Sequence, residues 1–113
     1  QFVDFVDKDI RFIKKNTDWI EDKERLTITK SCAKAFIRKT TKKYHIIFLD
    51  PPWDQLNIFN ESLKLIFDFD ILYEDGYVIC EHPFKDTFEE NYQIFKTRNS
   101  GKVSISMLKN KQL

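Results

Sequence analysis

The sequence predicts an α/β fold in which a mostly parallel sheet carries helices on both faces and ends in an antiparallel β-hairpin. Short β-prone runs alternate with segments of helical periodicity over residues 2–81. One run, Tyr44–Leu49, is apolar on both faces, as in a parallel strand between two helical layers. Two later runs with alternating polarity flank a turn pattern, Asn99-Ser100-Gly101, which indicates the hairpin.

The first third of the chain contains two predicted strand–helix pairs. Phe2–Val6 is short and β-prone, and an acidic residue, Asp7, stands at its end. Apolar residues then recur at helical spacing over residues 9–20, where Asp9 can cap the helix. Residues 26–29 form the second predicted strand. A short helix around Ala33 to Ile37 follows, with Ser31 as its expected N-cap.

The remaining elements follow from breakers and periodicity. Two prolines end the strand Tyr44–Leu49 abruptly, because proline cannot donate to a strand ladder. Phe59, Leu63, Ile66 and Phe67 form the apolar stripe of a helix. Asp75-Gly76 is a turn signal before the strand Tyr77–Glu81. The hairpin strands are expected at residues 92–96 and 102–108.

Composition bounds the class of protein. The chain has 113 residues, 42% of them hydrophobic, which suits one domain with one core. Nineteen basic and 18 acidic residues give a net charge of +1, which neither demands nor excludes nucleic acid. Cys32 and Cys80 form no C-x-x-C pair, and with two His they have no metal-ligand spacing. With neither a membrane span nor a signal peptide in the sequence, we expect a cytoplasmic protein.

Several polar side chains follow the predicted strands. In open α/β sheets, ligands bind beyond the carboxyl ends of the strands, so these residues should share one edge of the sheet. In chain order they are Asp7, then Ser31 and Cys32, then Asp50, Pro51, Pro52 and Trp53, and finally Glu81 and His82.

The most specific pattern is Asp50-Pro51-Pro52-Trp53. An enzyme that methylates an exocyclic amine must hold the NH₂ group and make its lone pair available. A carboxylate can accept one N–H, and a rigid backbone carbonyl in the proline segment can accept the other. An aromatic ring beside them can stack on an extruded base. The pattern therefore predicts transfer of a methyl group to an amino nitrogen, whereas Asp-Pro alone would indicate a strand-ending turn.

The other strand-end residues have weaker signals. An acid such as Asp7 commonly binds ribose hydroxyls, although a helix cap or solvated turn is the alternative. Ser31 and Cys32 stand where the adenine ring of a nucleotide cofactor would lie, and no base is evident that would make Cys32 a nucleophile. Glu81 and His82 could line the entrance of the substrate-binding site.

These residues together resemble the RsmD-like methyltransferases, which modify guanine N2 in 16S ribosomal RNA. The resemblance runs through nearly the whole chain. It is carried by the segments Phe5–Asp9, Ile13–Asn16, Ile46–Pro52 and Gly76–His82, and by the terminal hairpin from Lys96-Thr97-Arg98 to Gly101-Lys102-Val103. It implies a Rossmann-like class I methyltransferase fold, S-adenosyl-L-methionine as cofactor, and 16S rRNA or a small ribosomal subunit particle as partner. By this resemblance Asp50 and residues 51–53 are catalytic, and Asp7, Ser31, Cys32 and Asp50 bind the cofactor. Trp53, Glu81 and His82 are expected to bind the substrate.

The sequence departs from the family pattern at several points. Trp53 replaces the usual Tyr, Asp7 replaces Glu, and an Asp near the adenine is replaced around Cys32. The chain has two glycines, so the glycine-rich cofactor loop of the family cannot be built, and the first strand is missing. We therefore expect residues 1–113 to be a single methyltransferase domain, incomplete at its N-terminal side, monomeric, and a poor cofactor binder alone.

Two alternatives remain at this point. The same chemistry could act on DNA adenine or on a protein amide, since several amino-methyltransferase families share a D-P-P-aromatic loop. The other alternative is a non-catalytic α/β fragment that only binds RNA or a protein partner. The missing glycine-rich loop favours this alternative for this chain.

Overall fold

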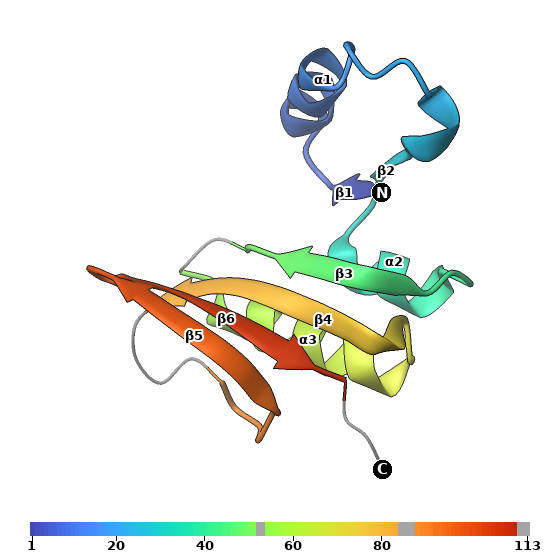
Figure 1. The fold of residues 1–113 in the computed structure, drawn as a ribbon. Helices are drawn as coiled ribbons and strands as arrows, with labels where there is room; N and C mark the ends of the chain where they lie inside the picture. Colours follow the sequence, from blue (N-terminus) through green and yellow to red (C-terminus); the bar gives the residue numbers. More distant parts are fainter. Residues whose placement is uncertain (52–53, 84–87, 111–113) are drawn as a thin grey trace. The chain divides into compact units, whose positions relative to one another are not determined.

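A computed structural model describes residues 1–51, 54–83 and 88–110. Figure 1 shows strands alternating with helices, followed by a C-terminal hairpin, so the predicted order of elements is confirmed. The chain divides into two compact units, residues 1–39 and 40–113, and each is described by itself. Among the helices that the structure describes, none has the length and apolar character needed to cross a membrane.

The first unit is a β-α-β-α segment. Its strands β1 (Phe2–Asp4) and β2 (Ile28–Lys30) pair in parallel, with Phe2 opposite Ile28. Helix α1 (Asp7–Asn16) and a 3₁₀ turn, η1 (Lys23–Arg25), connect them, and helix α2 (Ala33–Lys39) follows β2. A parallel pair joined by a helical crossover confirms the α/β class predicted for this part of the chain.

Local hydrogen bonds correct two predicted boundaries at the start of the first unit. Strand β1 ends at Asp4 and not at Val6, because the Asp4 carboxylate accepts the Val6 N–H at 2.9 Å and turns the chain. Helix α1 then begins at Asp7, with Val6 at the N-cap position. Asp7 is therefore the first helical residue and does not stand at the tip of the strand. Asp9 lies in the first turn, where its negative charge interacts favourably with the helix dipole, but it is not the N-cap residue.

The ends of the two helices also differ from the prediction. Helix α1 ends at Asn16 instead of Ile20, and Thr17 is its C-cap, where the N–H and the hydroxyl both donate to the Ile13 carbonyl, at 3.0 and 2.8 Å. Ser31 is not the N-cap of α2, since α2 begins at Ala33. Its hydroxyl donates to the Cys32 carbonyl at 2.9 Å and does not accept a helical N–H.

The second unit is a mixed sheet with one helix. Its elements are β3 (Tyr44–Leu49), α3 (Leu56–Asp68), β4 (Leu72–Pro83), β5 (Ile94–Ser100) and β6 (Val103–Lys109). The strand order is β3-β4-β6-β5; β3 and β4 are parallel, whereas β6 is antiparallel to both of its neighbours. This confirms the predicted hairpin and places its second strand beside β4.

Helix α3 builds the core of the second unit against one face of the sheet (Figure 1). Three of the four residues of the predicted stripe are confirmed, because Phe59, Leu63 and Ile66 are at most 1% exposed, whereas Phe67 is half-buried. On the sheet, Val78 and Leu108 are opposite each other and fully buried. At roughly 1.5–3 kcal/mol for each fully buried large apolar side chain, this layer stabilises the unit.

Strand β3 corrects the prediction of a central strand with helices on both sides. Within the second unit it is an edge strand that pairs with β4. Ile46 and Phe48 are 64% and 60% exposed, because α3 covers the opposite face of the sheet. Helices on both faces are therefore not found among the described residues of this unit.

Gly76 explains why the predicted turn at residues 75–76 is instead part of β4. The register shifts between the Tyr44–Leu72 and Ile46–Tyr77 pairs, so the chain bulges within the strand. A Cβ atom on Gly76 would lie 2.8 Å from the His45 carbonyl oxygen and 2.7 Å from Leu72 Cδ1. The glycine therefore permits a close approach between strands, whereas the hairpin turn is at Gly101, with φ of 63°.

Candidate active site

The loop after β3 carries the strongest predicted site residue. β3 ends at Leu49, so Asp50 and Pro51 begin the loop directly, as predicted. Leu49 pairs with Cys80 of the parallel strand β4, which brings Asp50 to the same edge as Glu81. The Asp50 side chain is exposed and hydrogen-bonds to no other described residue. Its carboxylate is therefore open to a ligand at the carboxyl edge of the sheet.

Pro51 restricts the backbone that follows this carboxylate. It is half-buried, and its ring fixes φ and removes the N–H while leaving the carbonyl as an acceptor. Pro52 and Trp53 of the predicted site lie outside the described residues. The described part of the loop therefore offers two acceptors, a carboxylate and a proline carbonyl, which suit a donor such as an amino group.

Glu81 and His82 at the end of β4 differ in their surroundings. Glu81 is half-buried and pairs with Ile105 on the face of the sheet that α3 does not cover. His82 is 5% exposed, in phase with the buried Cys80. The structure thus places the two predicted substrate residues on opposite faces of the sheet, with the His82 ring in the core and not at the exposed edge.

The His82 ring is part of a hydrogen-bonded chain across three strands. Its Nδ1 lies 2.8 Å from the Pro83 carbonyl and its Nε2 lies 2.8 Å from Ser106 Oγ. The Ser106 hydroxyl lies 3.0 Å from that of Thr97 on β5. Because a carbonyl only accepts, Nδ1 carries a proton, and a neutral ring then accepts from Ser106. This network links β4, β6 and β5 beside the carboxyl end of β4, the neighbour of the strand that Asp50 follows.

The residues predicted to bind a nucleotide cofactor lie in the first unit. Asp7 opens α1, and its carboxylate forms an ion pair with the Lys30 ammonium at the end of β2, at 2.8 Å. The Ser31 N–H donates to the Asp4 carbonyl at 2.9 Å, which joins the ends of the two parallel strands. Asp7, Ser31 and Cys32 thus follow the carboxyl ends of β1 and β2, whereas Asp50 and Glu81 belong to the second unit.

Cys32 has a more acidic thiol than an ordinary cysteine. The backbone N–H groups of Ala35 and then Lys34, at the start of α2, lower the pKa of its thiol. The side chain is exposed, whereas burial raises the pKa of Cys80 to about 12. Within the described part of the chain, no three His, Cys, Asp or Glu side chains are grouped to hold a metal ion.

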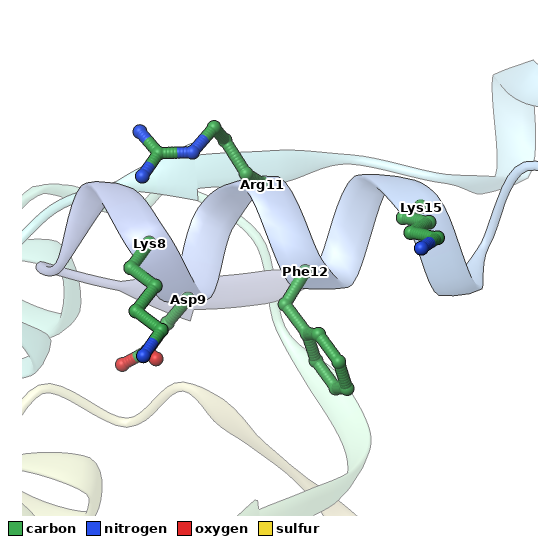
Figure 2. A pocket seen from close by; sticks show the side chains of 5 residues that line it. All are labelled: Lys8, Asp9, Arg11, Phe12 and Lys15. Carbon is green, nitrogen blue, oxygen red and sulfur yellow. The ribbon is translucent and has the colours of Figure 1, made fainter.

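Sequence reasoning missed a pocket on helix α1 (Figure 2). It is lined by Lys8, Asp9, Arg11, Phe12 and Lys15. The signal was available in the sequence, because spacings of three, four and seven residues place side chains on one side of a helix. The pocket contains none of the predicted site residues, so it is a separate feature of the first unit.

Comparison with protein families gives a match over almost the whole chain. A family model described as "Conserved hypothetical protein 95" matches residues 1–109. YlbH of Bacillus subtilis, which is named as a candidate rRNA methyltransferase, is 30% identical over 84 residues. That match covers 69% of this chain and 45% of YlbH, so the chain spans less than half the length of this relative.

Solved structures share the fold at low sequence identity. A candidate methylase from Haemophilus influenzae has a TM-score of 0.83 at 17% identity, and the match covers 98% of this chain and 71% of that protein. A candidate methyltransferase from Escherichia coli gives 0.81 at 18% identity, over 97% of this chain and 62% of that protein. An rRNA methylase from Streptococcus thermophilus gives 0.69 at 10% identity, over 97% and 72%. These likenesses confirm the α/β fold with its mixed sheet.

Proposed function

The chain belongs to the family described as "Conserved hypothetical protein 95", the RsmD-like proteins, and from this membership we propose that it is the substrate-binding part of a methyltransferase. The reaction is transfer of a methyl group from S-adenosyl-L-methionine to an exocyclic amino group. The target is guanine N2 of 16S rRNA, presented by the small ribosomal subunit. The single observation that carries the proposal is the exposed Asp50 carboxylate, followed by Pro51, at the carboxyl end of β3.

Asp50 and Pro51 orient the amine in this proposal. The carboxylate accepts one N–H of the target NH₂ group and the Pro51 carbonyl accepts the other. Both bonds draw the nitrogen out of conjugation with the base, which makes its lone pair available along the direction of attack. When the new N–C bond has formed, the nitrogen is cationic and releases one proton to the Asp50 carboxylate or to water. A strongly basic group is not required, so an ordinary aspartate is sufficient.

The cofactor side of the site would use residues of the first unit. S-adenosyl-L-methionine, when bound, supplies an electrophilic methyl group on sulfur. Asp7 is a suitable ribose acceptor, because its carboxylate is 68% exposed and its ion pair with Lys30 is exposed on both sides. Exposed pairs of this kind contribute at most about 1 kcal/mol, so sugar hydroxyls can compete with Lys30. Ser31 and Cys32 would lie beside the adenine ring, and Asp50 beside the methyl group.

Three further residues complete the proposed substrate site. Trp53 would stack on the target base, and Pro52 would hold the loop rigid. Glu81 would face the substrate, since it is next to Asp50 at the sheet edge and half-buried. For His82, burial and two hydrogen bonds support an indirect part in the site, through the end of β4.

The wider context is proposed on the same basis. Residues 1–113 would form one methyltransferase domain that is completed by a preceding segment with a glycine-rich loop. The protein would act in the cytoplasm as a monomer. YlbH supports the choice of RNA, because its name specifies rRNA.

Two measurements on the complete protein test the proposal. Calorimetric titration with S-adenosyl-L-methionine should give binding, and its absence would overturn the enzyme assignment. Incubation with small ribosomal subunits and labelled cofactor, followed by mass mapping of 16S rRNA, should give one methylated guanine. Methylation of adenine, or of a protein amide, would keep the amino chemistry and reject guanine N2.

A further inference from the structure

Helix α1 presents a surface with an unusual combination of side chains, which we call the α1 surface: Lys8, Asp9, Arg11, Phe12 and Lys15. Figure 2 shows Lys8, Phe12 and Lys15 in order along the helix, with Lys8 and Phe12 extending from one edge and Arg11 from the opposite edge. All of these side chains are exposed. The helix has its buried residue, Ile10, on another side.

The cations of the α1 surface are available to a ligand. Lys30, Lys43 and Lys64 each form an ion pair with a carboxylate. Over the described part of the chain, no ion pair or hydrogen bond engages the Lys8, Arg11 or Lys15 side chain. Asp9 is the one carboxylate among the five side chains, so the surface has an excess of positive charge.

An exposed aromatic ring lies among these cations. Phe12 is 67% exposed, so most of a large apolar side chain is in water. Grooves that hold single-stranded nucleic acid combine two features: cations along the phosphate backbone and aromatic rings on which bases stack. The α1 surface has both within two turns of one helix, and neither feature belongs to the amine-binding loop.

We propose that the α1 surface binds the RNA substrate at a distance along the strand from the methylated base. Lys8, Arg11 and Lys15 contact successive phosphates, and Phe12 stacks on an unpaired base. The proposal rests on the proposed function in taking RNA as the substrate. The α1 surface adds sequence-independent contacts that determine the affinity for RNA, whereas the Asp50 loop determines the reaction.

Charge decides between RNA and other occupants. A second copy of this chain would bring two positively charged helices together, which disfavours association through this surface. A polyanion gains from the same charges by releasing counterions. Packing of another segment of the same protein onto Phe12 is the remaining alternative, and the experiment below includes it as an outcome.

The first test compares two variants of the complete protein in which glutamine replaces positively charged residues. The triple variant Lys8→Gln, Arg11→Gln, Lys15→Gln removes three cations from the surface. Lys14→Gln removes an exposed cation of the same helix that does not line the pocket. Binding of fluorescent single-stranded oligoadenylate is measured by anisotropy over a range of salt concentrations. Because each phosphate contact contributes about 0.7 to the salt slope for single strands, the triple variant should lower the slope by about 2.

A second test uses the aromatic ring. Phe12→Ala should weaken oligoadenylate binding about fivefold or more, the lower limit for loss of a base–aromatic stack. Phe12→Tyr keeps the ring and should retain affinity, and Trp19→Ala removes an exposed aromatic residue outside the pocket as a control. Ultraviolet cross-linking of RNA to the unsubstituted protein should label the peptide that contains Phe12. This experiment does not depend on the folding of any variant.

Three outcomes would overturn the proposal. They are equal salt slopes for the triple and Lys14→Gln variants, cross-links that avoid α1, or a Phe12→Ala variant that loses thermal stability but not RNA affinity. The last outcome would mean that another segment of the protein covers the ring. Methylation of rRNA by the unsubstituted protein is scored separately. A protein that methylates rRNA without using α1 would therefore refute this surface and leave the proposed function intact.

Discussion

The two units of the chain bury their apolar side chains to different extents. In residues 40–113, α3 and the sheet enclose a layer of side chains that are at most 1% exposed, including Phe59, Leu63 and Val78. In residues 1–39 the buried apolar side chains are Ile10 and Ile37, at 8% and 6%. The unit that carries Asp50 therefore has its own core. The part with the proposed cofactor residues exposes much of its apolar surface.

The largest difference between the units is expected from identical substitutions in their helices. Ile66→Ala in α3 should lower the free energy of unfolding by about 4 kcal/mol, because a dense core cannot collapse around the cavity. Ile37→Ala in α2 should cost about 2 kcal/mol, since fewer buried side chains surround it and the site can relax after the substitution. Urea denaturation followed by circular dichroism measures both. Equal costs would show that the units are equally well packed.

A smaller effect tests the close approach of strands in the second unit. Gly76→Ala should cost about 1–3 kcal/mol, because the added carbon meets the His45 carbonyl oxygen. Gly101→Ala should cost about 1 kcal/mol, since its Cβ meets nothing but φ is positive. Asparagine tolerates that conformation, so Gly101→Asn should cost less than Gly101→Ala. Thermal melting would contradict this explanation if Gly76→Ala were neutral.

The cysteines compare the two units by reactivity, without a substitution. Cys32, exposed and with a lowered pKa, should react with iodoacetamide at lower pH than a free thiol does. Cys80 should remain unmodified until the second unit opens. Burial raises its pKa from 9.0 to about 12, so its contribution to stability is complete below pH 9 and is lost as pH rises towards 12. Mass spectrometry of alkylated peptides checks both residues, and early labelling of Cys80 would contradict its burial.

The sequence predicted the elements that local patterns determine. β3 has the predicted bounds because a continuous apolar run that ends at two prolines is a strong signal. Phe59 and its helical repeats lie on the buried side of α3 because their spacing is that of a helix. The turn predicted at Asp75-Gly76 was wrong because glycine marks both turns and close approaches of backbone, and the two require different tertiary contacts. The hydrogen bond from the Val6 N–H to the Asp4 carboxylate moved the end of β1, a boundary that periodicity alone could not fix.

The site was predicted to a similar degree. Asp50 follows the strand as expected, since the two consecutive prolines after it cannot donate to a strand ladder. His82 is buried in phase with Val78 and Cys80, and strand alternation could have indicated this. Exposure of Ile46 and Phe48 could not be predicted, because it depends on which helices cover the sheet. The α1 surface was missed because cations at helical spacing are typical of any solvated helix face.

Methyl transfer by an Asp50→Ala variant tests the central claim most directly. In the complete protein, Asp50→Ala should lower the single-turnover rate of rRNA methylation by about 10²–10³-fold, the usual loss for a group that acts in the transition state. Its affinity for S-adenosyl-L-methionine should change little if Asp7, Ser31 and Cys32 hold most of the cofactor. Asp54→Ala removes a second exposed carboxylate from the same loop and should keep the rate. An Asp50→Ala rate within a few fold of the unsubstituted protein would contradict the role of this carboxylate.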